Sequence, residues 1–131
     1  MDIENARLFA LGLGQVTEKL FAENWISFCI AGKWFMLIQL NAPEPRIAVK
    51  LPPDMGEQLR EQYNGVKPAY HMNKRHWNDL YLNSDLTDNK IEELVRMAFE
   101  TVVAKLPKKI RTGIITSKNK QPNENDIGQS L

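Results

Sequence analysis

The chain has 131 residues, of which 43% are hydrophobic and 25% are charged, and its formal net charge is +1. This length fits one domain, and the composition is that of a globular protein, which excludes collagen-like and fully disordered chains. A single cysteine, Cys29, excludes a disulfide framework and a cysteine-rich zinc module. The acidic N-terminus is unlike a secretory signal, and the longest apolar run is far shorter than a membrane span. We therefore expect a cytoplasmic protein that does not enter a membrane.

The charge is divided unevenly along the chain. Residues 1–104 contain 11 Lys or Arg against 14 Asp or Glu, whereas residues 105–131 contain 6 against 2. The C-terminal part is polar and has no sustained hydrophobic period, so it has too little apolar surface to offset the entropy of ordering it. We therefore predict one domain over residues 1–108 and a flexible basic and polar tail over residues 109–131.

The first predicted element is a helix over residues 2–12, because Ile3, Ala6 and Ala10 recur at helical spacing before two glycines. Residues 16–23 are a candidate for a short extended segment. Residues 26–40 give the clearest strand signal: two β-branched and aromatic runs meet at Ala31-Gly32, where glycine supplies the positive φ of a tight hairpin.

A two-residue turn at that hairpin determines which side chains share a face. The core face would hold the pairs Ile30–Lys33, Phe28–Phe35 and Ile26–Leu37. The opposite face would hold Ser27, Cys29, Trp34, Met36 and Ile38. Since side chains alternate along a strand, this apolar second face is either partly covered or a working surface.

The second half of the chain adds a strand over residues 46–51 and a helix that begins near Pro53 and ends at Gly65. Extended stretches around residues 66–72 and 77–82 follow, joined near Asn73-Lys74-Arg75. The last helix is capped by Thr87 or Asp88, and Pro107 ends it. Its apolar stripe is Ile91, Leu94, Val95, Ala98, Val102 and Leu106.

This order of elements, α-β-β-β-α-β-β-α, predicts an α+β domain. The short connections favour an antiparallel sheet of about five strands with helices packed on it.

Signatures of enzymes are missing from the sequence: there is no glycine-rich phosphate loop, no nucleophile elbow and no zinc-protease motif. Cys29 lies in the middle of a predicted strand, which favours a small sheet residue over a nucleophile. His71 and His76 would face each other across a two-residue turn, but two histidines without further ligands make an incomplete metal site. The sequence therefore predicts a non-enzymatic protein with no metal and no cofactor.

The stretch from Lys67 to Asn78 interleaves basic, amide and aromatic side chains, a mixture that suits a reader of nucleic acid. Lys and Arg neutralise phosphates, Asn and Arg bond to base edges, and Trp77 or Tyr70 would stack on an exposed base. The alternative is a solvated hairpin tip whose aromatic rings complete the core. The candidate nucleic-acid-binding residues are Lys67, His71, Asn73, Lys74, Arg75, His76 and Trp77.

At this stretch the sequence closely resembles the signature of the MmcQ/YjbR family of small bacterial proteins. The resemblance rests on Gly65 to Asn78 and Leu80-Tyr81-Leu82, and it extends to Ala31-Gly32-Lys33, Leu59 to Tyr63, and Leu94 through Lys109. It covers roughly residues 1–110. It implies an α+β fold with an antiparallel sheet, and DNA binding by analogy with a double-winged DNA-binding domain; it implies no catalytic residues.

Two functions from different classes stay open. The first is DNA binding, in which the basic hairpin contacts the phosphate backbone of a duplex. The second is a regulatory module that binds a protein, a second copy of the chain or a small ligand through the apolar second face of the sheet. A third class, a small enzyme, rests only on Cys29 and the two histidines. For DNA, the excess of acids in residues 1–104 predicts weak binding with a shallow salt dependence.

Overall fold

The computed structural model describes residues 1–120, and within them it has four helices around a six-stranded sheet. The elements are α1 (Ile3–Leu11), β1 (Val16–Phe21), β2 (Trp25–Ile30), β3 (Lys33–Gln39), β4 (Arg46–Lys50), α2 (Pro53–Gln62), β5 (Val66–Pro68), β6 (Trp77–Tyr81), α3 (Asp88–Val103) and α4 (Lys108–Lys120). This confirms the predicted α+β class. The sixth strand is β1, where the sequence indicates only a candidate extended segment.

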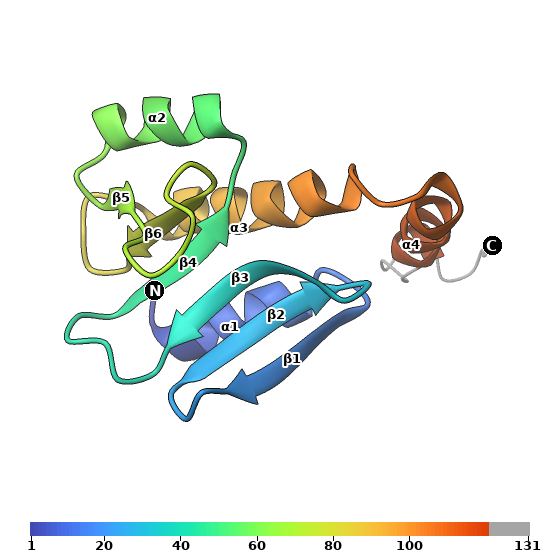
Figure 1. The fold of residues 1–131 in the computed structure, drawn as a ribbon, viewed down its shortest axis with the longest axis horizontal. Coiled ribbons are helices and arrows are strands. Elements are labelled where there is room, and N and C mark those ends of the chain that lie inside the picture. Colours follow the sequence, from blue (N-terminus) through green and yellow to red (C-terminus); the bar gives the residue numbers. More distant parts are fainter. Residues whose placement is uncertain (121–131) are drawn as a thin grey trace.

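The strands lie in the order β1-β2-β3-β4-β6-β5, and every neighbouring pair is antiparallel. Helices α1 and α3 pack on one face and appear behind the sheet in Figure 1, while α2 lies beside the edge strand β5. Within residues 1–120 no helix covers the other face. Instead the loop of residues 69–76, between β5 and β6, lies in front of it (Figure 1).

The main core fills the space between the sheet and α1 and α3. The predicted stripe of α3 faces this core, and Phe99 adds to it by meeting the ring of Phe35 edge-on at 5.5 Å between centroids. Thr87 is the cap, since its side-chain oxygen accepts a hydrogen bond from the backbone nitrogen of Lys90 at 3.0 Å. Burial of this apolar stripe, rather than helix propensity alone, holds α3 on the sheet.

A β-bulge in β3 changes the predicted faces of the first hairpin. Ile30 pairs with Lys33 as predicted, but the register shifts so that Phe28 pairs with Met36. One extra residue, Phe35, is accommodated on β3, and a bulge of this kind reverses the in-and-out alternation beyond it. The prediction was therefore wrong for three residues. Met36 and Ile38 belong to the helix-covered core, and Leu37 lies on the other face.

The C-terminal segment begins with a helix that the sequence does not predict. The sequence predicts a flexible tail from residue 109, whereas the structure has α4 over Lys108–Lys120. The side chain of Ile114 is 5% exposed and joins the main core, and the guanidinium of Arg111 donates a hydrogen bond to the carbonyl of Ala104 at 3.2 Å. The buried side chain of Ile114 and the hydrogen bond from Arg111 to the end of α3 thus hold the first part of α4 in place. The segment itself has no sustained apolar period. Residues 121–131 of the predicted tail lie outside the described residues.

Candidate functional site

The loop of residues 69–76 is built from two consecutive turns. The backbone nitrogen of Met72 donates to the carbonyl of Ala69, and the carbonyl of Asn73 accepts from the nitrogens of His76 and Trp77. At the base of the loop the nitrogen of Ala69 donates to the carbonyl of Trp77 at 3.1 Å. The loop is therefore longer than the predicted two-residue turn, and its own hydrogen bonds hold its shape.

This loop carries most of the sequence-predicted site residues, and the structure separates their roles. Lys74 and Arg75 are exposed at its tip, and the ammonium of Lys74 lies 5.2 Å from the centre of the Tyr70 ring. The side-chain oxygen of Asn73 accepts from the backbone nitrogen of Arg75, so it serves as a turn cap. Lys67 is exposed on β5, away from the tip. Hydrogen bonds from the backbone nitrogens of Asn64 and Gly65 lower the pKa of Asp85, and the positive charge of Lys67 lowers it further.

The aromatic candidate Trp77 lies in a place that rules out base stacking in this conformation. Its side chain is 6% exposed and packs with Leu37, Ala48 and Ala69 in a second, smaller cluster on the face opposite α1 and α3. The sequence leaves two alternatives open for this ring, stacking on a base or completing the core, and the structure has the second. Trp77 supports the loop from below and is not a contact residue.

The two histidines do not face each other. His71 meets the ring of Trp25 edge-on, 5.9 Å between centroids, on the uncovered face of the sheet. His76 is half-buried at the other end of the loop, near Lys50 and Lys105. Among the described residues, no three His, Cys, Asp or Glu side chains come close enough together to hold a metal ion.

A pocket of about 260 Å³ lies where the end of α3 meets the start of β3 and the end of β4. Three lysines line it, Lys33, Lys50 and Lys105, over an apolar floor of Val102 and Leu106. In the part of the chain that the structure describes, none of the three lysines forms an ion pair with a carboxylate. Their mutual repulsion is thus left for an anion or solvent to relieve.

The imidazole of His76 responds to the same cations. Burial lowers its pKa first, and the positive charges of Lys50, Lys105 and Arg75 lower it further. The carbonyl of His76 also accepts from the backbone nitrogen of Leu51 at 2.8 Å, which places this end of the loop next to Lys50 of the pocket. We call Lys33, Lys50, Lys74, Arg75 and Lys105 the basic end of the molecule.

Sequence reasoning missed three members of the basic end. Lys33, Lys50 and Lys105 are far apart in the sequence, and they meet only through the register of β3 with β4 and the docking of α3. The strand pattern alone gives no signal for this meeting. The one sequence feature that points to the region is the absence of acids between residues 105 and 120.

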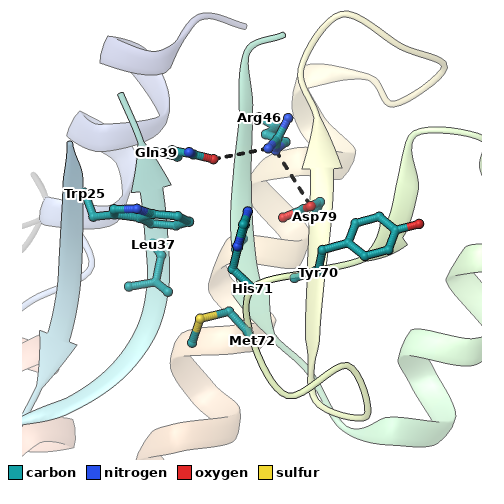
Figure 2. A pocket seen from close by; sticks show the side chains of 10 residues that line it. Trp25, Leu37, Gln39, Arg46, Tyr70, His71, Met72 and Asp79 are labelled. Atoms are coloured by element: carbon teal, nitrogen blue, oxygen red, sulfur yellow. Dashed lines mark hydrogen bonds and ion pairs between the residues drawn. The ribbon is translucent and has the colours of Figure 1, made fainter. Parts of the chain in front are cut away.

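The uncovered face of the sheet holds a second group of polar side chains. Arg46 lies 3.7 Å from the carboxylate of Asp79 and donates to the side-chain oxygen of Gln39 at 3.1 Å. Burial raises the pKa of Asp79 to about 6, although the positive charges of Arg46 and His71 oppose the rise. Figure 2 shows this group beside Trp25 and His71, with the ring of Tyr70 directed away from them.

No helix within residues 1–120 is long and apolar enough to cross a bilayer.

Solved structures share this fold. The crystal structure of the Deinococcus radiodurans protein DR2400, described with a DUF419 domain, superposes with a TM-score of 0.79 at 23% identity, over 86% of this chain and 87% of that one. A crystal structure of a Pseudomonas syringae protein gives a TM-score of 0.65 at 26% identity, over 77% of this chain and 98% of that one. The first likeness shows the fold alone.

Sequence relatives come from bacteria. The chain is 34% identical over 77 residues to the uncharacterized protein YjbR of Escherichia coli strain K12, a match that spans 59% of this chain and 65% of that protein. It is 32% identical over 89 residues to the uncharacterized protein YbdF of Escherichia coli O157:H7, which is 68% of this chain and 73% of that protein. A family model described as YjbR matches residues 11–101. Because that match covers most of the described chain and includes the signature stretch after Gly65, the chain belongs to the YjbR family.

Proposed function

We propose that this protein binds DNA through the phosphate backbone, with the basic end as the contact surface. The observation that carries the proposal is a pocket of three lysines next to the base of a loop whose tip exposes Lys74 and Arg75, with no carboxylate partner for any of the five among the described residues. Phosphates are neutralised by such groups, and their counterions are released on binding. The cations come from β3, β4, the loop and the turn after α3, so a shared scaffold presents them together.

The arrangement explains how a chain with little net charge attracts a polyanion. Residues 1–104 have more acids than bases, but salt screens charges beyond about 10 Å, so a local group of cations decides the contact. Two cations elsewhere are already paired with carboxylates: Arg7 with Glu4 and Glu18, and Lys90 with Glu93. The proposal therefore expects weak binding, because only a few phosphates are engaged.

Fluorescence anisotropy with a labelled random-sequence duplex, titrated at several salt concentrations, tests the proposal. Five cations predict a slope of log K against log salt no steeper than about −4.5. The double variant Lys74→Gln/Arg75→Gln should weaken binding by about tenfold or more, since it removes two phosphate contacts. Absence of binding at 50 mM salt would overturn the proposal.

The matched control removes the same net charge from elsewhere. Lys90→Gln/Arg96→Gln changes two cations on α3, and Lys90 is 13 residues before Val103, the last residue of the helix, about 20 Å along its axis. Binding of this control should stay within about twofold of the wild type. Equal losses in the two double variants would mean that net charge alone, and not the basic end, attracts DNA.

A further inference from the structure

The uncovered face of the sheet has a groove that the proposed contacts with the DNA phosphate backbone do not use. It encloses about 300 Å³, and its walls are Phe21, Trp25, Trp34, His71 and Met72, with Gln39 at its inner end. This volume is at the lower end of the range for small-molecule sites, and it suits one flat ring rather than a large ligand. The walls come from β1, β2, β3 and the loop of residues 69–76.

The aromatic walls hold one another in fixed orientations. The ring of Phe21 lies 5.1 Å from that of Trp34 and 6.1 Å from that of Trp25, and His71 meets Trp25 edge-on. Trp34 nevertheless remains 38% exposed, which is unusual for so large an apolar side chain. Rings that are exposed and already ordered form a stacking platform, because little conformational entropy is lost when a partner binds.

The inner end of the groove is polar, which excludes a purely hydrocarbon occupant. Gln39 and His71 line both the groove and a recess below it, where Arg46 and Asp79 lie and where about 10 Å³ is left, room for roughly one water molecule. The side-chain oxygen of Gln39 accepts from Arg46, so its amide nitrogen is directed to other acceptors. A planar heterocycle with ring nitrogens and carbonyl oxygens matches this combination of stacking walls and a polar end.

Cations of the basic end lie on the loop that forms one wall of the groove. His71 and Met72 of that wall precede Lys74 and Arg75, which are exposed at the tip of the same loop, whereas Lys33, next to Trp34 on β3, points to the opposite face and lines the lysine pocket. Positive charge beside stacking rings is the combination that single-stranded nucleic acids bind. We propose that the groove receives an unpaired base of a single-stranded nucleic acid whose phosphates lie on the basic end. This inference rests on the proposed backbone binding and names the form of nucleic acid that the site prefers.

Three labelled ligands of equal length separate the inference from the function on which it rests. They are ten-nucleotide oligothymidine, its abasic counterpart with the same phosphates, and a ten-base-pair duplex, all measured by anisotropy at 50 mM salt. We expect oligothymidine to bind at least about tenfold more tightly than the abasic strand, because stacking of one base contributes that much. We expect the duplex to bind like the abasic strand.

The other possible results of this experiment distinguish base binding from backbone binding. Equal binding of oligothymidine and the abasic strand would overturn the base-binding groove and leave backbone binding intact. No binding of any of the three would overturn both proposals. If free thymidine monophosphate quenches the tryptophan fluorescence at the concentration at which oligothymidine does, the ligand is a free nucleotide and the single-strand assignment is wrong.

Two substitutions of exposed aromatic residues locate the effect. Trp34→Leu should remove most of the difference between oligothymidine and the abasic strand while leaving abasic binding unchanged. The matched control is Tyr70→Leu, because Tyr70 is 76% exposed and its ring points away from the other rings in Figure 2. A loss of base preference in Tyr70→Leu but not in Trp34→Leu would overturn the assignment to this groove. Since both rings are exposed, thermal unfolding should show that both variants remain folded.

Discussion

The two faces of the sheet are built from similar side chains but differ in how far they are covered. The face under α1 and α3 is closed, and Phe28, Phe35 and Leu94 on that side are fully buried. The opposite face has only a small cluster around Trp77, under the loop of residues 69–76, and beside it Trp34 stays exposed. Antiparallel sheets commonly leave one face to solvent, and on this face the exposed ring of Trp34 is the feature that points to binding.

The largest effect is expected on the covered face. Phe35→Ala removes a fully buried ring that meets Phe99, so it should lower the free energy of unfolding by about 3–5 kcal/mol. Urea unfolding followed by circular dichroism measures this loss. A loss below about 1 kcal/mol would mean that the covered face is not the main core.

A second substitution asks how far the covered core extends. Ile114→Ala should cost about 2–3 kcal/mol, because the side chain of Ile114 is buried at the edge of that core, where the site can partly collapse. The control is Ile110→Ala, since Ile110 is 45% exposed on the same helix and should change stability little. Equal, small effects in the two variants would support the flexible tail that the sequence predicts.

Asp79 on the uncovered face should make the free energy of unfolding depend on pH. Because the pKa of Asp79 is about 6 when folded and close to 4 when unfolded, the folded state holds an extra proton between these values. Stability due to this group is therefore present below pH 4 and lost as the pH rises through 6. Relative to Asp79→Asn, the wild type should lose on the order of 2 kcal/mol between pH 4 and pH 7.

The measurement is the difference in unfolding free energy between wild type and Asp79→Asn at each pH, which cancels the titration of groups that both proteins share. A difference that stays constant from pH 4 to pH 7 would show that Asp79 ionises normally, and the recess would then be solvated.

The smallest effect on stability is expected for Trp34→Leu, although it is the substitution that should most affect base preference. The ring of Trp34 is exposed and contacts Phe21, so unfolding should change by less than about 0.5 kcal/mol. Differential scanning calorimetry of the variant checks this value. A loss comparable with that of Phe35→Ala would assign Trp34 to the core and remove it from the binding face.

The sequence predicts the covered face well because that face depends on local periodicity. The stripe of α3 and the alternation of β4 repeat at the spacing of their own elements, and both are found as predicted. The faces of β3 are not predicted beyond Phe35, because the bulge is set by how β2 and β3 fit together and not by either strand alone.

The candidate site is predicted only in part, for a related reason. Lys74 and Arg75 are recognisable because they lie within one unusual stretch, whereas Lys50 and Lys105 join them through tertiary packing. The aromatic ring chosen for stacking, Trp77, is buried, whereas Trp34 on β3 is exposed beside the half-buried rings of Phe21 and Trp25. Which of two tryptophans points to solvent depends on where a loop lies, and a pattern of residue types does not contain that information.

The most direct test of the account is a titration of the ¹⁵N-labelled protein with oligothymidine, followed by amide and indole chemical shifts. The account predicts that shifts concentrate in the loop of residues 69–76, at Lys50 and Lys105, and at the indole signals of Trp25 and Trp34. The indole of the buried Trp77 should move little. Shifts confined to the helix-covered side, or no shifts at 50 mM salt, would contradict the account.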